Sequence, residues 1–265
     1  MAKVKFTASM KLATWNVNSV KMRASAIADW LGEHAPDVLA LQEIKCETAA
    51  FVADTFHAAG YAHVLPIGQK SYNGVAMISR RPFEVVHSAL PGDAADIQAR
   101  YAEIKINNLH VINIYAPNGN PLGTEKFTYK LAWLARLEVR LRELMNANTP
   151  FVVMGDFNII PEDRDCYDPV AWQGDALFQP ESRAAFRRMI NLGLTDAICM
   201  FYPQDEIYTF WDYQAGAWAR NYGIRIDHIL LSPAAADRCT GAGVDKSPRG
   251  RDQPSDHVPV WVELR

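Results

Sequence analysis

Short apolar runs that end in polar residues recur along this chain, and this pattern constrains the fold more than any other sequence feature. Each run has the length and the β-branched or aromatic content typical of a strand. The predicted strands are Lys11–Asn18, Asp37–Glu43, Tyr61–Leu65, Val75–Ser79, Arg100–Ile106, His110–Tyr115, Phe151–Asp156, Tyr208–Tyr213, Ile224–Ser232 and Val258–Leu264. Asn107-Asn108 lies between two of these runs and predicts a hairpin turn.

Helical periodicity appears between the strands. Apolar residues recur at helical spacing from Val20 to Leu31, with Ser19 as the expected N-cap. The longest helical pattern runs from Thr124 to Leu144, and a shorter one covers Ser182–Asn191. Strands outnumber helices, which favours packed sheets covered by helices. The chain has no internal repeat or break in composition, so we expect one domain over residues 1–265.

Composition excludes several classes of protein. Of the 265 residues, 49% are hydrophobic and 22% are charged, which excludes disordered, collagenous and coiled-coil chains. No run approaches the roughly 18 apolar residues of a membrane helix, and the start lacks a signal-peptide core, so we expect a cytosolic protein without a membrane partner. The net charge of −3 means that any affinity for nucleic acid needs a local basic face.

The four cysteines are Cys46, Cys166, Cys199 and Cys239, and they form no C-x-x-C pair. Neither a zinc site nor a disulfide framework is therefore indicated. We expect free, mostly buried thiols.

Groups that can bind a divalent cation or transfer a proton follow several predicted strands. They lie in Trp15-Asn-Val-Asn18, Leu41-Gln-Glu43, Tyr115-Ala-Pro-Asn118, Gly155-Asp-Phe-Asn158, Arg225-Ile-Asp-His228 and Ser255-Asp-His257. Loops at strand ends are where a rigid scaffold usually presents its chemistry. Carboxylate and amide oxygens without cysteine suit Mg²⁺ or Mn²⁺ better than zinc.

Each of these residues also has a structural interpretation when taken singly. Asn16 could cap a turn, Glu43 could be a solvated strand end, and Tyr115 could be a packing residue. Asp227 could be the exposed partner of Arg225. Gly155-Asp-Phe-Asn158 is a sharper signal, because side chains two residues apart on a strand point the same way. The joint occurrence of all these groups favours a catalytic site.

In this order the motifs resemble the endonuclease/exonuclease/phosphatase superfamily, and within it the bacterial exonuclease III family of class II apurinic/apyrimidinic endonucleases. The resemblance also includes Tyr72-Asn-Gly-Val-Ala76, Tyr208-Thr-Phe-Trp-Asp-Tyr213 and Gly223-Ile-Arg-Ile-Asp227, and it covers nearly the whole chain. It implies a four-layer α/β sandwich, with two packed mixed β-sheets flanked by helices. The active site would lie at one rim between the sheets.

The resemblance also implies a role for each site residue. Glu43 would be the main Mg²⁺ ligand, with Mn²⁺ as a substitute ion. Asp156 would orient and deprotonate the attacking water, and Asn158 would hold the phosphate or the water in line. The full implied metal set is Asn16, Glu43, Asp156, Asn158, Asp256 and His257.

The remaining catalytic roles implied by the resemblance concern the phosphate. Asp227 would fix the orientation of His257, whose other ring nitrogen would face the scissile phosphate. Tyr115 would hydrogen-bond the phosphate or assist the leaving oxygen. Generating a nucleophile at neutral pH and neutralising phosphoryl charge are the tasks that phosphodiester cleavage requires.

The implied partner is double-stranded DNA with abasic sites or with blocked or recessed 3′ ends, bound by a monomer. A basic strip would consist of Lys45, Lys70, Arg220, Arg225 and the segment Lys246–Arg251. Such cations would hold phosphates without reading bases. The full expected DNA-binding set is Lys45, Asn118, Phe210, Trp211, Trp218, Arg220, Ile224, Arg249 and Arg251. Of these, Phe210, Trp211, Trp218 and Ile224 would line a pocket for an extruded abasic sugar, although each could equally be a core residue.

One departure from the family pattern and two rival functions stay open at this point. After Tyr115-Ala-Pro the family has a longer polar or cationic side chain, whereas this chain has Asn118-Gly-Asn-Pro121. The balance between abasic-site incision and 3′-end trimming is therefore open. The rivals are a phosphatase or phospholipase on the same scaffold, and a nucleic-acid-binding adaptor on an inactive nuclease scaffold. The nuclease-like Tyr208–Tyr213 segment argues against the first, and the complete set of catalytic side chains argues against the second.

Overall fold

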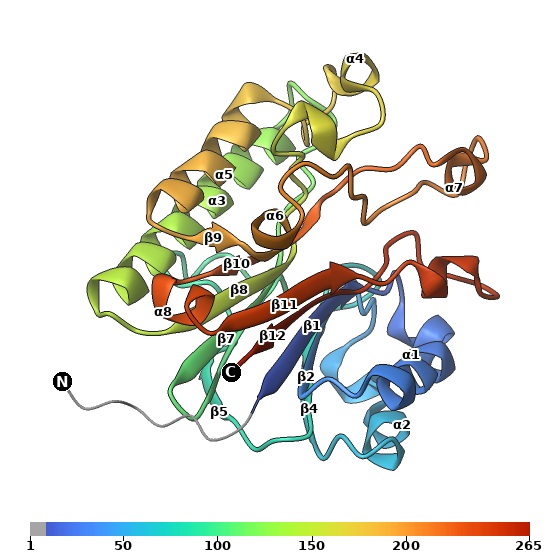
Figure 1. Cartoon of the computed structure of the whole chain (residues 1–265), viewed down its shortest axis with the longest axis vertical. Coiled ribbons are helices and arrows are strands. Elements are labelled where there is room, and N and C mark those ends of the chain that lie inside the picture. Colours follow the sequence, from blue (N-terminus) through green and yellow to red (C-terminus); the bar gives the residue numbers. More distant parts are fainter. Residues whose placement is uncertain (1–8) are drawn as a thin grey trace.

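The computed structural model describes residues 9–265, in which two β-sheets pack face to face with helices on their outer sides (Figure 1). Sheet A has the strand order β11-β12-β1-β2-β4-β3, and sheet B has the order β5-β6-β7-β8-β10-β9. The strands of sheet A are β1 (Met10–Asn16), β2 (Val38–Gln42), β3 (His63–Ile67), β4 (Val75–Ser79), β11 (Cys239–Val244) and β12 (Val260–Leu264). The strands of sheet B are β5 (Glu84–His87), β6 (Tyr101–Ile106), β7 (Leu109–Tyr115), β8 (Phe151–Asp156), β9 (Thr195–Asp196) and β10 (Asp227–Leu231).

Helices complete the outer layers, with α1 and α2 against sheet A and α3 and α5 against sheet B. The α-helices are α1 (Val20–His34), α2 (Ala53–Ala58), α3 (Glu125–Asn146), α4 (Pro169–Trp172), α5 (Pro180–Asn191), α6 (Ala197–Phe201), α7 (Ala217–Arg220) and α8 (Pro233–Ala236). Short 3₁₀ turns are η1 (Thr48–Ala50), η2 (Asp163–Asp165) and η3 (Ser247–Gly250). This arrangement confirms the expected four-layer α/β sandwich.

The core has three layers of apolar contact. Between the sheets, side chains such as Leu12, Met77 and Val111 pack in one buried cluster. Trp30 of α1 is buried on the outer face of sheet A, and Leu137 of α3 is buried on the outer face of sheet B. Burial of these faces is the main source of stability in such a fold.

The sheets are mixed, and their strand directions bring several strand ends to one rim. β1 runs parallel to β2, and β7 runs parallel to β8, so the carboxyl ends of each pair lie together. β10 is antiparallel to β8 and starts at the same rim, with Asp227 opposite Asp156.

A buried polar network ties the two sheets together just below this rim. The Gln42 side-chain amide of sheet A donates to the Asn113 side chain of sheet B at 2.7 Å. Asn113 in turn donates to the backbone carbonyl of Leu41 at 3.0 Å. These bonds fix the position of β2 relative to sheet B. Glu43 directly follows β2, so its position is fixed with it.

Several sequence expectations about elements were wrong. Tyr208–Tyr213 is not a strand: among the described residues it makes only isolated bridges, from Phe210 to Ile224 and to His257, since the chain crosses the rim here instead of following a neighbour. β5 and β11 were missed, because β5 is largely exposed and β11 contains Thr240-Gly-Ala-Gly243, which lacks an apolar pattern.

Other local expectations have mixed outcomes. Ser19 occupies the N-cap of α1, but its φ of 95° leaves the side chain without a capping hydrogen bond. The hairpin turn at Asn107-Asn108 is confirmed between β6 and β7. All four cysteines are free as expected, but only Cys46 and Cys166 are buried. Within residues 9–265 no helix is both long and apolar enough to cross a membrane.

Candidate active site

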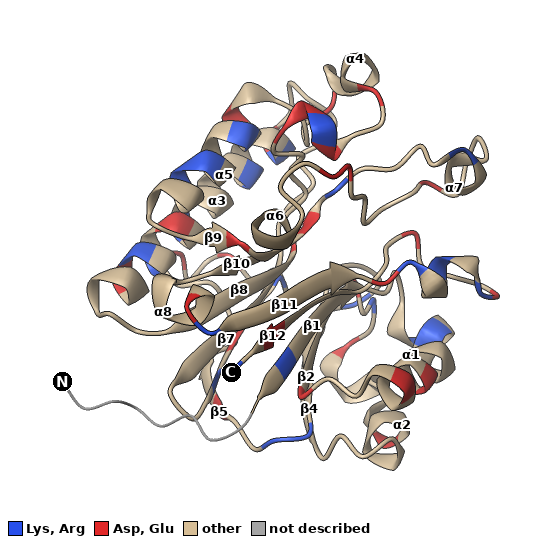
Figure 2. Cartoon of the chain, viewed as in Figure 1, with Lys and Arg blue, Asp and Glu red and all other residues tan. Residues whose placement is uncertain are grey.

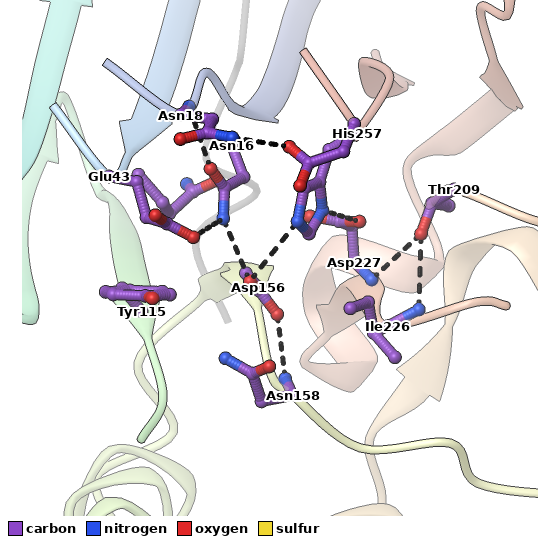
Figure 3. A network of polar contacts seen from close by, with 12 residues as sticks. Asn16, Asn18, Glu43, Tyr115, Asp156, Asn158, Thr209, Ile226, Asp227 and His257 are labelled. Carbon is purple, nitrogen blue, oxygen red and sulfur yellow. Dashed lines mark hydrogen bonds and ion pairs between the residues drawn. The ribbon is translucent and has the colours of Figure 1, made fainter. Parts of the chain in front are cut away.

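Glu43, Asp156 and His257 meet at the rim between the two sheets (Figure 3). Each offers one potential ligand atom, and these atoms lie within 4.8 Å of one another. Asn16, at the end of β1, joins the two carboxylates: its Nδ2 donates to Glu43 Oε1 at 2.8 Å and to Asp156 Oδ2 at 3.0 Å. Residues from four distant parts of the sequence therefore form one cluster.

Backbone geometry at the strand ends places these side chains. Gly155 has a φ of +143°, and a Cβ there would lie 2.0 Å from the carbonyl oxygen of Ile114 on β7. Only glycine allows β7 and β8 to approach so closely just before Asp156. Glu43 and Asn158 both adopt left-handed backbone conformations, with φ of 49° and 50°. Such strain is concentrated at functional sites, where surrounding contacts enforce it.

Asp156 is a buried carboxylate with a strongly perturbed pKa. Its Oδ1 accepts the backbone N–H of Asn158 at 2.8 Å. Burial raises its pKa to about 7, an effect that nearby Asp227 and Glu43 reinforce and that His257 opposes. A carboxylate with a pKa near neutrality is suited to general-base catalysis at physiological pH.

His257 and Asp227 form a buried pair beside Asp156. His257 Nδ1 lies 2.8 Å from Asp227 Oδ2, while His257 Nε2 points toward Asp156 at 3.9 Å. Burial opposes a positive charge on the imidazole, but Asp227 and Asp156 outweigh it and raise the pKa of His257 to about 10. The charged ring therefore donates hydrogen bonds from both of its nitrogens.

Neighbouring loops hold this pair in place. Thr209 Oγ1 accepts the backbone N–H groups of Ile226 and Asp227 at 3.2 and 3.1 Å (Figure 3). Trp15 Nε1 donates to the carbonyl of His257 at 3.1 Å. The Phe210 ring meets the His257 ring edge-on, with centroids 4.9 Å apart.

Asn158, Asn118 and Tyr115 lie on the sheet B side of the cluster. Asn158 Nδ2 donates to the carbonyl of Ala116 at 2.9 Å, and Asn118 Nδ2 approaches Asn158 Oδ1 at 3.4 Å. Burial, reinforced by the negative charge of Glu43, raises the pKa of Tyr115 well above its usual value, so its hydroxyl keeps its proton.

Lys45, Asn18 and Asp256 border the cluster on the sheet A side. Lys45 Nζ lies 2.9 Å from Glu43 Oε2 and donates to Asn18 Oδ1 at 2.5 Å. Asn18 Nδ2 donates to Asp256 Oδ1 at 3.1 Å. Burial opposes ionisation of Glu43, but hydrogen bonds from Asn16 and Lys45 outweigh it and lower its pKa. Asp256 therefore contacts Asn18, and Asn18 lies between it and the Glu43–Asp156 cluster.

The donor chemistry fits a hard divalent cation. Glu43 and Asp156 supply carboxylate oxygens close together, and among the described residues the buried Asp227 Oδ1 has no hydrogen-bond partner. Oxygen donors of this kind suit Mg²⁺ or Mn²⁺. Asn16 presents its amide nitrogen to both carboxylates and so orients them.

Four residues expected to contact DNA are buried elsewhere. Trp211 and Ile224 pack in separate apolar clusters with exposed fractions of 0% and 1%, so they do not line an open pocket. Arg249 is buried, and it stacks near Tyr213 while donating to the carbonyl of Trp211 at 3.1 Å. Arg225 is engaged by two aspartates within the protein. These residues have the side-chain types expected of a DNA-binding surface, but each is buried and contacts other parts of the protein instead.

The other expected DNA contacts remain at the surface or at the rim. Arg220 is exposed on α7, and Arg251 pairs with Glu33 at 2.6 Å. Phe210 and Trp218 are half-buried. Figure 2 shows cationic residues on α7 and around η3, two segments that project on the same side of the molecule, with acidic residues among them.

Sequence reasoning missed three residues that support the site: Thr209, Arg23 and Lys130. Arg23 of α1 is buried, and it donates to the carbonyls of Val17 and Pro254 at 3.1 and 3.0 Å. A signal was present for two of them, because Arg23 and Lys130 fall at i+3 from Val20 and Phe127, on apolar helix faces. Thr209 gave no such signal.

Comparison with known proteins identifies the family. The model of the Endonuclease/Exonuclease/phosphatase family matches residues 13–257. The chain belongs to this family. Family members are metal-dependent, which agrees with the carboxylate cluster.

Similar proteins span nearly the whole chain. It is 34% identical to exodeoxyribonuclease III of Haemophilus influenzae, over 97% of this chain and 100% of the relative. It is 30% identical to the DNA repair nuclease APEX1 of Danio rerio, over 97% of this chain and 83% of the relative. The expectation of a DNA repair nuclease is confirmed at this level.

Solved structures agree in fold. A Neisseria 3′ phosphatase, NExo, solved with a product DNA hairpin, superposes with a TM-score of 0.93 at 39% identity, covering 97% of this chain and 99% of that chain. An AP endonuclease from Archaeoglobus fulgidus gives a TM-score of 0.91 at 38% identity, with 96% and 98% covered.

Proposed function

We propose that this protein hydrolyses phosphodiesters in damaged double-stranded DNA with Mg²⁺, or Mn²⁺ in its place. Its activities are incision at abasic sites, 3′–5′ exonuclease action and removal of 3′-blocking groups, as part of base excision repair in the cytosol. It acts as a monomer. The observation that carries this proposal is the buried Asp156 carboxylate, which lies beside a charged His257 and opposite Glu43.

The protein's own residues supply the proton transfer and the alignment. Asp156 accepts a proton from the attacking water. His257, oriented by Asp227, donates a hydrogen bond from Nε2 to a phosphate oxygen, and Asn158 aligns the water or the phosphate. Tyr115, still protonated, donates to the phosphate or to the leaving 3′ oxygen.

The cation has a separate task. Glu43 and Asp156 would hold this cation, with Asp256 farther out behind Asn18, and the bound cation would supply charge neutralisation at the phosphoryl oxygens. Lys45 and Asn118 contact the DNA backbone next to the site, Arg220 and Arg251 do so farther out, and Phe210 and Trp218 border the position of the sugar.

The decisive test is incision of a duplex that carries one abasic analogue, compared with nicked DNA, a 3′-phosphate end and phosphoinositides. We expect metal-dependent cleavage of DNA, and none by the Asp156→Asn variant. Turnover of phosphoinositides without DNA cleavage would support a phosphatase instead. DNA binding without any turnover in Mg²⁺ would support an inactive adaptor.

A further inference from the structure

A fully buried lysine on α3 lies directly beneath the catalytic loops. Lys130 has an exposed fraction of 0%, although it belongs to a helix that otherwise buries apolar side chains such as Leu134 and Leu137. Its Nζ donates to the carbonyl of Asn158 at 2.5 Å and to that of Asn118 at 3.0 Å. A third bond, to the carbonyl of Ala176, measures 3.4 Å.

These three carbonyls belong to three separate loops. Asn158 follows β8, Asn118 follows β7, and Ala176 precedes α5. An ammonium group has three N–H donors, and Lys130 donates all three to these backbone carbonyls. Within residues 9–265 no carboxylate forms an ion pair with it.

Burying a lysine without an ion pair is costly, which makes a purely structural role a poor explanation. Burial lowers the pKa of Lys130 to about 7. An apolar side chain of the same length would avoid the cost of burying a charge, but it would leave the Asn158 and Asn118 carbonyls without the hydrogen bonds from this lysine. The scaffold nevertheless places a cation here, against the loops that carry the proposed catalytic groups.

Both backbone polar groups of Asn158 are held by hydrogen bonds. The N–H of Asn158 donates to Asp156 Oδ1 at 2.8 Å, and the C=O of Asn158 accepts from Lys130 Nζ. The Asn118 loop wraps closely around the lysine stem, because a Cβ on Gly119 would lie 2.7 Å from Lys130 Cδ. Loss of the ammonium would release the strained Asn158 backbone, whose φ is 50°.

We propose that Lys130 is a positioning residue for catalysis, which locks the Asn158 and Asn118 loops together and so keeps Asn158 and Asp156 aligned on the phosphate. This inference rests on the proposed function, since it assumes that Asp156 and Asn158 act on the substrate. Lys130 itself is screened from substrate by its complete burial.

The test replaces Lys130 by methionine, which keeps the unbranched stem and removes the donors. In single-turnover incision of an abasic duplex with Mg²⁺, we expect the rate of Lys130→Met to fall about 10- to 100-fold, the size of effect that small misplacement of reacting groups produces. The Kd for DNA should change less than about threefold, because Lys130 itself is buried and Asn118 is only one of several proposed DNA contacts. Lys130→Gln, which keeps an N–H donor, should recover part of the rate.

Glu103→Gln is the matched control for loss of a buried charge. Glu103 of β6 is buried, and it bonds Arg140 of the same helix α3 at 2.8 Å, away from the catalytic loops. The Glu103→Gln substitution should lower the melting temperature while leaving the single-turnover rate within about twofold of wild type. A similar rate loss in Glu103→Gln would show that Lys130 acts only through stability.

Two further outcomes would overturn the proposal. One is a folded Lys130→Met enzyme with a wild-type rate; if this variant does not fold, a wild-type rate for Lys130→Leu, which also removes every donor, counts equally. The other is a rate loss that saturating DNA restores. Asp156→Asn runs in parallel: if it keeps full activity, the catalytic assignment fails, whereas an inactive Asp156→Asn with a fully active Lys130→Met rejects only the role of Lys130.

Discussion

Two clusters of buried charge lie on either side of the segment Arg225–Asp227, and they are built in opposite ways. Arg225 binds Asp165 at 2.7 Å and Asp196 at 2.6 Å. Burial opposes ionisation of Asp196, but Arg225 outweighs it and holds the pKa of this carboxyl far below its usual value. In this cluster each charged group has a partner of opposite sign.

The catalytic cluster lacks this balance. Asp227 and Asp156 share one imidazolium, and Asp227 Oδ1 has no partner among the described residues. Here burial raises the pKa of Asp156 to about 7, although the neighbouring His257 lowers it. The same residue types therefore stabilise the fold where each charge is paired. Where buried carboxylates outnumber their cationic partners, they favour binding of a metal ion or a proton.

Removal of divalent cations should have the largest effect. We expect excess EDTA to abolish incision of an abasic duplex, with a loss of more than about 1,000-fold, because the unbalanced carboxylates then have no counter-ion. Mg²⁺ or Mn²⁺ should restore activity, and zinc should do so poorly. Full activity in EDTA would contradict the metal assignment.

Asp156→Asn tests whether the imbalance serves catalysis. The single-turnover rate should fall about 100- to 10,000-fold, the usual contribution of a general base. Stability should stay equal or rise by about 1 kcal/mol, because the change removes a buried charge from beside two other carboxylates. Urea unfolding measures this, and a large loss of stability would show that Asp156 belongs to a balanced network after all.

Arg225→Met tests the balanced cluster. Leaving Asp165 and Asp196 buried without their partner should cost about 3–5 kcal/mol in unfolding free energy. The rate of the folded variant should stay within about threefold of wild type. Because the pKa of Asp196 is lowered in the folded protein, wild-type stability should fall as the pH drops below about 4, and the variant should show a flatter profile.

Asp227→Asn and His257→Asn test whether the unbalanced pair acts as a unit. Each single change should cost about 100-fold in rate. The double variant should lose much less than the product of the two, since Asp227 has nothing to orient once His257 is gone. Circular dichroism checks folding, and strictly multiplicative losses would separate the two roles.

Arg220→Gln should have the smallest effect. As an exposed cation outside both clusters, Arg220 should contribute about one phosphate contact. Its loss should weaken binding to all duplex sequences alike and flatten the plot of log affinity against log salt by about 0.9. An unchanged slope would place the DNA-binding face elsewhere.

Most buried strands and the chemistry at their ends could be predicted from the amino-acid sequence alone. The apolar runs Lys11–Asn18, His110–Tyr115 and Phe151–Asp156 predicted strands that the structure contains, because burial on both faces leaves a continuous apolar pattern; the first of these strands ends two residues earlier, at Asn16. The polar residues that follow them predicted a site of oxygen donors, and Glu43, Asp156 and His257 meet there.

Tertiary packing was needed to show which cations and aromatics face solvent and which support the scaffold. Arg225, Arg249 and Trp211 matched the pattern of a DNA-binding surface, yet packing buried them, while Lys130 went unnoticed on an apolar helix face. The reason is physical: a residue's type limits the bonds it can make, but its partners come from segments tens or hundreds of residues away, and only packing brings those segments together.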